Sequence, residues 1–343
     1  GDIVLKAPGA VLAEYRAVGA GVGDEAGTSA PRRRCLVIQA AGTKTDFATG
    51  RVLDMDASYR VIRETFAARG IDCFRVDELL FSSDGWPELV RAILSVDLAV
   101  CDLSTQDNAA LHLTGVCLAL RASKVFVRAE ANFSAALLPS WFGPLNSYEC
   151  LPEWPAGELD KGLLEYIGSA MQGVTGSPAA TEPARPGLVY TLLSAPPMNV
   201  EAPPALASAE VSSGLEPPDD LAHVCFVIQG FGLKTDLFSG RSLDLDKSFT
   251  VIKDALQADG LECVRLDVPP VELPGQALDF LLRAPLAIVD LSAGLPDVLL
   301  QLGLRHGLRP GQTLLLAEEG YRVPPELGTL RILRYKHLGE DVG

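Results

Sequence analysis

The chain has 343 residues, of which 48% are hydrophobic, and this length and composition suit two domains with separate cores. Its 29 lysines and arginines against 44 aspartates and glutamates give a formal net charge of -15. Electrostatic repulsion therefore argues against a nucleic acid or a membrane surface as a partner. A basic pocket for a small nucleotide remains compatible with this charge, because the charge of one pocket is a local property.

The seven cysteines are scattered without a Cys-x-x-Cys pair, and most of them stand inside apolar runs such as the one that begins at Cys35. This usage is typical of buried thiols in a reducing compartment. Because no apolar run is long enough to span a bilayer, the sequence predicts a cytoplasmic protein.

An internal repeat is the strongest signal in the sequence. The segment CLVIQAAGTKTDFATGRVLDMDASYRVI, which begins at Cys35, returns as CFVIQGFGLKTDLFSGRSLDLDKSFTVI from Cys225. Farther along, the register slips by two residues, and the apolar run that ends at Asp102 then matches the run that ends at Asp290. The sequence therefore predicts a duplicated fold in which these two aspartates occupy equivalent positions.

Short β-branched runs alternate with amphipathic stretches in each copy, which is typical of a parallel sheet with crossover helices. In the first copy we expect strands at 35–39, 72–76, 97–103, 124–128 and 146–150, and helices at 56–69, 86–95, 108–121 and 157–171. In the second copy we expect strands at 224–229, 262–266, 285–291, 312–317 and 330–335, and helices at 246–259, 275–283 and 297–307. This order predicts an α/β fold of two tandem Rossmann-like (flavodoxin-like) domains, each with a five-stranded parallel sheet flanked by helices.

The segment between the copies is rich in Pro, Ala, Ser and Gly, a composition that favours extended chain over a packed core. We therefore divide the chain into an N-terminal segment (1–34), a first domain (35–172), a linker (173–221) and a second domain (222–338). Below, residues 35–172 are called the first copy and residues 222–338 the second copy.

Ligands of open parallel sheets bind beyond the carboxyl ends of the strands, where the strand order reverses, so the loops after strands one and three are the candidate site. The loop after strand one repeats a glycine, a lysine and an aspartate: Gly42, Lys44 and Asp46 in the first copy, and Gly232, Lys234 and Asp236 in the second. Glycine lets backbone N–H groups approach a ligand, and lysine can meet a phosphate. The alternative is that the glycines only turn the chain and the lysines are solvated.

Two further repeated motifs contain an arginine. Arg51 and Arg241 each follow a Gly turn, where they could hold a carboxylate or phosphate or, in the reading that we favour, pair with a nearby aspartate of their own domain. At the end of strand two, Arg75-Val-Asp77 corresponds to Arg265-Leu-Asp267, and either the aspartate contacts a ribose or the arginine pairs locally.

Asp102 and Asp290 are the best candidates, because each carboxylate ends strand three. The alternative role is to cap the next turn together with Ser104 or Ser292.

With these motifs in hand, the chain resembles the deoxyribohydrolase-like domain. This family is related to nucleoside deoxyribosyltransferases and occurs in bacterial signalling proteins and in the TRAFs-binding region of apoptosis signal-regulating kinases. The second copy carries CFVIQGFGLKTD, SGR, VDLS and DVLLQLGLRHGLRP in the order of the family. The first copy keeps CLVIQAAGTKTD, TGR and CDLS, but its last motif has become NAALHLTGVCLALR.

The resemblance also marks a departure. Enzymes of the family use a glutamate in the last motif as nucleophile or charge stabiliser, and Leu113 and Gln301 stand at that position here. Neither side chain can replace a carboxylate in covalent glycosyl transfer. The surviving pocket residues include Arg305 of the second copy, whereas His306 is expected to be a packed, hydrogen-bonded helix residue.

These observations predict a non-catalytic nucleotide-sensing or scaffold module that binds a nucleotide-derived small molecule, through the second copy more readily than the first, and that relays occupancy to a protein partner or a fused effector domain. We expect no cofactor. We also expect no metal site, because His112 has no Cys or carboxylate partner at metal-ligand spacing. Two alternatives stay open: a nucleoside or NAD glycohydrolase that uses Asp102, Asp290 or another carboxylate, and a purely structural module.

Overall fold

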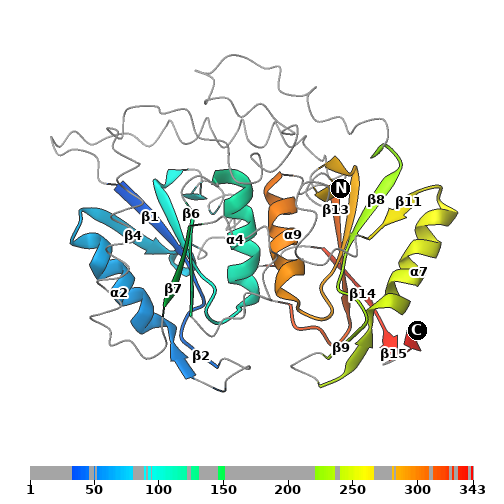
Figure 1. The fold of residues 1–343 in the computed structure, drawn as a ribbon, viewed down its shortest axis with the longest axis horizontal. Helices are drawn as coiled ribbons and strands as arrows, with labels where there is room; N and C mark the ends of the chain where they lie inside the picture. Colours follow the sequence, from blue (N-terminus) through cyan, green and yellow to red (C-terminus); the bar gives the residue numbers. More distant parts are fainter. Residues whose placement is uncertain are drawn as a thin grey trace, which may run out of the picture.

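The computed structural model of the chain describes residues 33–45, 50, 52–79, 89, 92–93, 95–121, 125–130, 146–150, 221–235, 240–265, 280–281, 283–308, 312–323, 327, 331–338 and 341–342. Within these ranges the chain is mixed α/β, with parallel sheets flanked by helices, as the sequence predicts (Figure 1). The predicted linker and the predicted helix at 157–171 lie outside the described residues, and the predicted helices at 86–95 and 275–283 lie mostly outside them.

The first sheet has five parallel strands: β1 (Arg33–Ile38), β4 (Ile71–Arg75), β5 (Leu98–Asp102), β6 (Val125–Glu130) and β7 (Asn146–Cys150). Their order across the sheet is β4-β1-β5-β6-β7. β1 pairs in parallel with β4 on one side and with β5 on the other, so the chain changes direction across the sheet at β1. Each strand lies within two residues of its predicted bounds, and in β1 and β5 the apolar residues are buried on both faces, as in a parallel sheet covered by helices.

The second sheet repeats this topology with β8 (Val224–Ile228), β11 (Glu262–Val264), β12 (Leu286–Asp290), β13 (Thr313–Glu318) and β14 (Ile332–Tyr335), in the order β11-β8-β12-β13-β14. Asp102 and Asp290 are the last residues of the two central strands, β5 and β12. They therefore occupy equivalent positions, as the repeat predicts.

The longer helices also match their predicted bounds: α2 (Met55–Ala67), α4 (Asn108–Arg121), α7 (Leu245–Ala258) and α9 (Pro296–Leu308). Asp54 and Asp244 cap α2 and α7, since each carboxylate accepts hydrogen bonds from backbone N–H groups of the first turn. A 3-10 turn, η1 (Val76–Glu78), follows β4.

The segment after the first strand of each copy, which the sequence predicts as a loop, forms a two-stranded antiparallel hairpin. Its strands are β2 (Thr43–Thr45) and β3 (Val52–Asp54) in the first copy, and β9 (Leu233–Thr235) and β10 (Ser242–Asp244) in the second. Gly50 and Gly240 adopt positive φ angles of 71° and 69° in the connecting turns. Strands of three residues are too short and polar to show an apolar alternation. β15 (His337–Leu338) and β16 (Asp341–Val342) form a further antiparallel pair.

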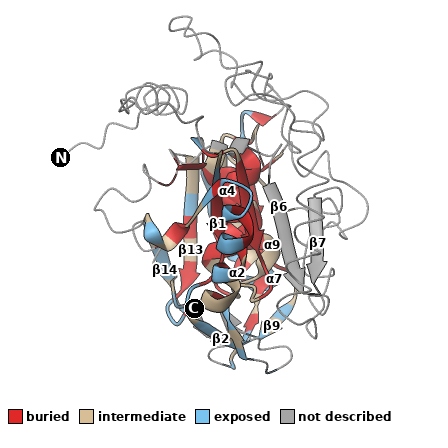
Figure 2. Ribbon diagram, turned by 90° about the vertical axis from the view of Figure 1, so that its left-hand side faces the viewer, coloured by how far each residue is buried: buried red, intermediate tan, exposed pale blue. Residues whose placement is uncertain are grey.

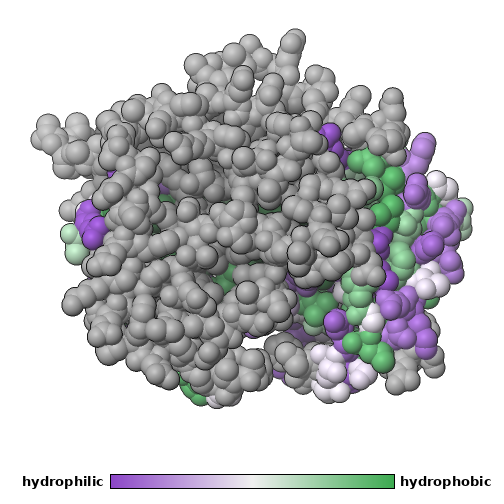
Figure 3. Space-filling view, viewed as in Figure 1, coloured by the Kyte–Doolittle hydropathy of each residue, from purple (hydrophilic) through white to green (hydrophobic). Residues whose placement is uncertain are grey.

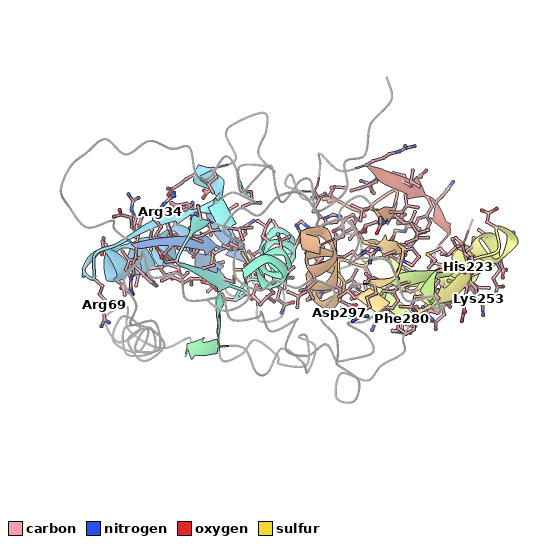
Figure 4. All side chains as sticks on the ribbon, turned by 90° about the horizontal axis from the view of Figure 1, so that it is seen from above. Arg34, Arg69, His223, Lys253, Phe280 and Asp297 are labelled. Atoms are coloured by element: carbon pink, nitrogen blue, oxygen red, sulfur yellow. The ribbon has the colours of Figure 1, made fainter. Side chains whose placement is uncertain are left out.

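Helices and sheets are stacked in layers, with α4 and α9 side by side in the middle (Figures 1 and 4). α2 covers the outer face of the first sheet through Tyr59, Ile62 and Phe66, and α7 covers the outer face of the second sheet through residues such as Phe249 and Ile252. The inner faces of both sheets share one apolar core with α4 and α9, and α4 is buried from Ala109 to Ala119 (Figure 2).

The two central helices cross at a pair of glycines that are equivalent in the repeat, Gly115 of α4 and Gly303 of α9. A Cβ atom on Gly115 would lie 2.2 Å from the Leu300 carbonyl oxygen, and one on Gly303 would lie 1.9 Å from the His112 carbonyl oxygen. Since His112 and Leu300 are also equivalent in the repeat, the contact has the symmetry of a two-fold interface. The two copies pack on each other as the subunits of a dimer would.

Two polar contacts join the copies beside this crossing. The buried imidazoles of His112 and His306 form a hydrogen bond of 3.0 Å between Nε2 and Nδ1. The Asn108 amide donates to the Tyr321 hydroxyl at 3.3 Å. The prediction that His306 is a packed, hydrogen-bonded helix residue is confirmed.

On the outside of the second copy, apolar and polar side chains are interspersed over the described part of the face shown in Figure 3. No helix among the described residues is long and apolar enough to cross a membrane.

Candidate ligand site at the carboxyl ends of the sheets

Asp290 of the second copy is buried, and its carboxylate accepts four hydrogen bonds. Its carboxylate accepts hydrogen bonds from the Ser292 backbone N–H at 3.0 Å, the Ser292 hydroxyl, the Gln229 amide at 2.7 Å and the Tyr335 hydroxyl at 2.9 Å. Burial raises the pKa of Asp290, and these hydrogen bonds oppose the rise. Both oxygens of the carboxylate are thus engaged within the protein.

Ser292 and Tyr335 tie this carboxylate to the neighbouring strands. The Ser292 hydroxyl accepts from the Glu318 N–H at 2.8 Å and lies 2.9 Å from the Tyr335 hydroxyl. Burial and the negative charge of Asp290 raise the pKa of Tyr335. The carboxyl ends of β8, β12, β13 and β14 are therefore joined by one network of side chains.

Two further contacts close this end of the second sheet. The Leu295 side chain packs so tightly on Gly230 that a Cβ atom there would lie 2.2 Å from it. Arg241, next to the β9–β10 hairpin, forms an ion pair with the buried Glu318. Glu318 belongs to strand β13, far along the chain from Arg241. The favoured pairing of Arg241 with Asp244 stays a prediction.

The equivalent end of the first sheet is arranged differently. Asp102 is buried, and its carboxylate accepts from the Ser104 N–H at 3.0 Å. Gln39, the counterpart of Gln229, donates its amide N–H to the Met55 carbonyl at 2.6 Å. The buried Ser104 Oγ and Thr105 Oγ1 atoms have no hydrogen-bond partner in the structure, and the amide oxygens of Gln39 and of its counterpart Gln229 both lack one.

The lysines of the hairpins lie near the N-termini of the central helices. Lys44 Nζ lies 3.3 Å from the carboxylate of Asp107, which also accepts from the Ala109 and Ala110 N–H groups at the start of α4. In the second copy, the charge of Lys234 lowers the pKa of Asp297 in α9, although burial raises it more. Gly42 and Gly232 adopt positive φ angles, 71° and 65°, where the hairpins begin.

The arginines at the end of strand two pair locally, which is one of the two alternatives for this motif. Arg75 bonds Asp56 at 2.6 Å and Asp77 at 2.6 Å. Arg265 bonds Asp246 at 2.7 Å, and its guanidinium lies over the rings of Phe231 and Phe249. The hydrogen bond from Arg75 is the main reason that the pKa of Asp56 is lowered.

Arg305 is not brought together with Asp290. Its guanidinium donates to the carbonyls of Leu281 at 2.7 Å, Ala284 at 2.8 Å and Gln312 at 3.1 Å. Because Ala284 precedes Asp290 by six residues along an extended segment, Arg305 lies about 20 Å away, at the opposite end of the sheet. It holds three chain segments together instead of facing the candidate site.

The positions at which the enzymes of the resembled family carry a glutamate lie on the central helices. Leu113 of α4 is buried in the shared core, and Gln301 of α9 is partly buried. Asp46, Asp236, Asp267 and Arg51 lie outside the described residues.

The site residues expected from the sequence do not include Gln39, Gln229, Glu318 or Tyr335. The two glutamines recur at the same place in the repeat and carried a usable signal. Glu318 recurs as Glu130 and carried the same signal. Tyr335 has no such signal, since the register of the first sheet puts Cys150 in its place.

Within the part of the chain that the structure describes, no group of three or more His, Cys, Asp or Glu side chains is placed to hold a metal ion. In comparisons with known proteins, no family model matches the chain and no curated protein matches it significantly.

Proposed function

We propose that the chain is a non-catalytic binding module. Two Rossmann-like (flavodoxin-like) domains, related by duplication, bind a nucleotide-derived small molecule at a strand end and relay its presence to a protein partner or a fused effector domain. The strand order on both sides of β1 and β8 supports this fold. The resemblance to deoxyribohydrolase-like domains supports the ligand class and a role in prokaryotic signalling or defence.

The observation that carries the proposal is the state of the carboxylates. Glycosyl transfer needs a carboxylate that is free to attack or to stabilise charge at the sugar carbon. Asp290 is instead engaged on both oxygens by side chains of its own copy, and Leu113 and Gln301 offer no carboxylate at the family position.

A relay between the copies is supported by the central helices. Asp107 joins the hairpin residue Lys44 to the first turn of α4, and α4 carries His112, which is bonded to His306 of α9. A ligand that shifts the loop after β5 would thereby act on the helix that contacts the other copy.

A thermal-shift screen of the whole chain against nucleosides, nucleotides and NAD tests the proposal. At a hundredfold excess over its dissociation constant, a ligand stabilises the folded chain by about 2.7 kcal/mol, and we expect at least one such compound. No stabilisation by any of them would favour the purely structural alternative, which the self-contained network of the second copy already suits.

A further inference from the structure

We infer that the two copies have divided roles: the first copy holds the ligand, through a hydroxyl-bearing or N–H-bearing part such as a ribosyl group, and the second copy is closed by its own side chains. This inference rests on the proposed function and assigns ligand binding to the first copy. It reverses the expectation from the sequence motifs, which favoured the second copy.

The first support is the hydrogen bonding of equivalent atoms. In the second copy, the Ser292 hydroxyl and the Gln229 amide satisfy Asp290. In the first copy, the hydroxyl of Ser104 is more than nine-tenths buried and has no partner in the structure. The amide oxygens of Gln39 and Gln229 both lack a partner, so the copies differ in the serine hydroxyl and in the glutamine N–H group, which bonds Asp290 in the second copy and the Met55 carbonyl in the first. Buried polar atoms are nearly always hydrogen-bonded, so the Ser104 hydroxyl indicates a missing partner in the first copy.

The second support is that two of the side chains that close the second copy, Leu295 and Tyr335, are replaced in the first, whereas Arg241 and Glu318 recur there as Arg51 and Glu130. Leu295, which packs on Gly230, corresponds to the polar Asp107. Tyr335 stands opposite Glu318 in the sheet, and the strand register of the first copy puts Cys150 in that place.

The loop after the central strand shows the same difference. Thr105, whose hydroxyl also has no partner in the structure, corresponds to Ala293. Gln106 has a positive φ of 51°, where the second copy has Gly294 at 59°. The first copy thus keeps a polar side chain and a strained backbone in a loop that the second copy builds from small residues.

The donors and acceptors define the chemistry of the ligand. Gln39 Oε1 and the Asp102 carboxylate can only accept hydrogen bonds, whereas the hydroxyls of Ser104 and Thr105 can donate or accept. The buried part of the ligand must therefore donate, as sugar hydroxyls or a base N–H group do, and a phosphate beside Asp102 would meet repulsion. A phosphate would instead lie toward Lys44, which is 40% exposed at the rim.

Isothermal titration of the whole chain tests the division of roles. The probes are the four common ribonucleosides, their 5′-monophosphates and their 2′,3′-dideoxy analogues. The variants are the double substitution Ser104→Ala with Thr105→Ala in the first copy and, as a matched control, Tyr335→Phe, which removes one hydroxyl from the second copy. We expect at least one ribonucleoside to bind the double variant about tenfold more weakly than it binds the wild type. Its 2′,3′-dideoxy analogue should bind the wild type about tenfold more weakly than the ribonucleoside does. Tyr335→Phe should leave the affinity for the ribonucleoside nearly unchanged.

The outcomes separate the two claims. If binding is lost in Tyr335→Phe and kept in the double variant, the second copy holds the ligand, so the inference fails while the proposed function stands. If only the phosphorylated probes bind and their sugar hydroxyls are dispensable, the donor argument is overturned. If no probe binds, the inference fails, and the proposed function fails as well only if the thermal-shift screen, which includes NAD, also finds no ligand.

Discussion

Ser292 and Ser104 occupy the same place in the repeat but have different partners. The Ser292 hydroxyl connects Asp290, Tyr335 and the Glu318 backbone within one network. Ser104 Oγ is buried without a hydrogen-bond partner in the structure. Identical residues at one topological position therefore have separate roles, which depend on the strands that pack beside them.

This difference predicts unequal effects on stability. Ser292→Ala should lower the free energy of unfolding by about 1–3 kcal/mol, because it leaves buried polar groups without a partner. Ser104→Ala should change it by less than about 0.5 kcal/mol in the absence of ligand, since no hydrogen bond of that hydroxyl is lost. Urea denaturation of both variants measures the two effects, and equal losses would argue against the difference between the sheet ends.

The buried pair His112 and His306 predicts a dependence on pH. Burial lowers the pKa of both imidazoles, that of His306 to about 4, so both are neutral in the folded chain at pH 7. In the unfolded chain their pKa is about 6.5. As the pH falls below this value, only the unfolded state takes up the protons, so stability is present above pH 6.5 and is lost on acidification.

Between pH 7 and 5.5 we expect this loss to be about 1 kcal/mol for each histidine. His112→Gln keeps an N–H donor for His306 and should reduce the pH dependence by about half. The control is His223→Gln, a substitution at an exposed position, which should leave the pH dependence of stability unchanged. Denaturation curves at the two pH values check this, and a pH dependence that persists in His112→Gln would contradict it.

At the scale of elements, the strands and the long helices could be predicted from the sequence because their apolar residues recur with a clear period. The hairpins could not, since strands such as β2 (Thr-Lys-Thr) have no buried face to produce a pattern. The apolar residues of α4 indicate a buried helix, but they do not identify α9 as its partner. At the candidate site, the aspartates and serines were foreseeable as repeated strand ends, whereas Tyr335 and Leu295 depend on long-range packing.

The close crossing of α4 and α9 predicts whether Gly303→Ala raises or lowers the stability of the chain. On helix propensity alone, Gly303→Ala should stabilise the chain by about 1 kcal/mol. The structure predicts the opposite, a loss of about 1–3 kcal/mol or more, because the new methyl group would meet the His112 carbonyl at 1.9 Å. A rise in the urea midpoint of Gly303→Ala would show that the helices do not approach this closely.

For the whole molecule, the shared core predicts that the two copies unfold together. All three tryptophans, at positions 86, 141 and 154, belong to the first copy, so their fluorescence reports on that copy, whereas far-ultraviolet circular dichroism reports on both. The urea transitions followed by the two signals should coincide in the wild type and separate in Gly303→Ala. Separate transitions in the wild type would mean that the interface contributes little to stability.

The central claim is that this duplicated fold binds without catalysing, and a hydrolysis assay tests it most directly. The purified whole chain is incubated with nucleosides and NAD, and release of the free base is measured by chromatography. We predict no release above the buffer control, because the carboxylate of Asp290 is fully engaged and Leu113 and Gln301 stand where the enzymes that the chain resembles carry a glutamate. Release that survives purification and is abolished by Asp290→Asn would contradict the claim and identify the chain as a glycohydrolase.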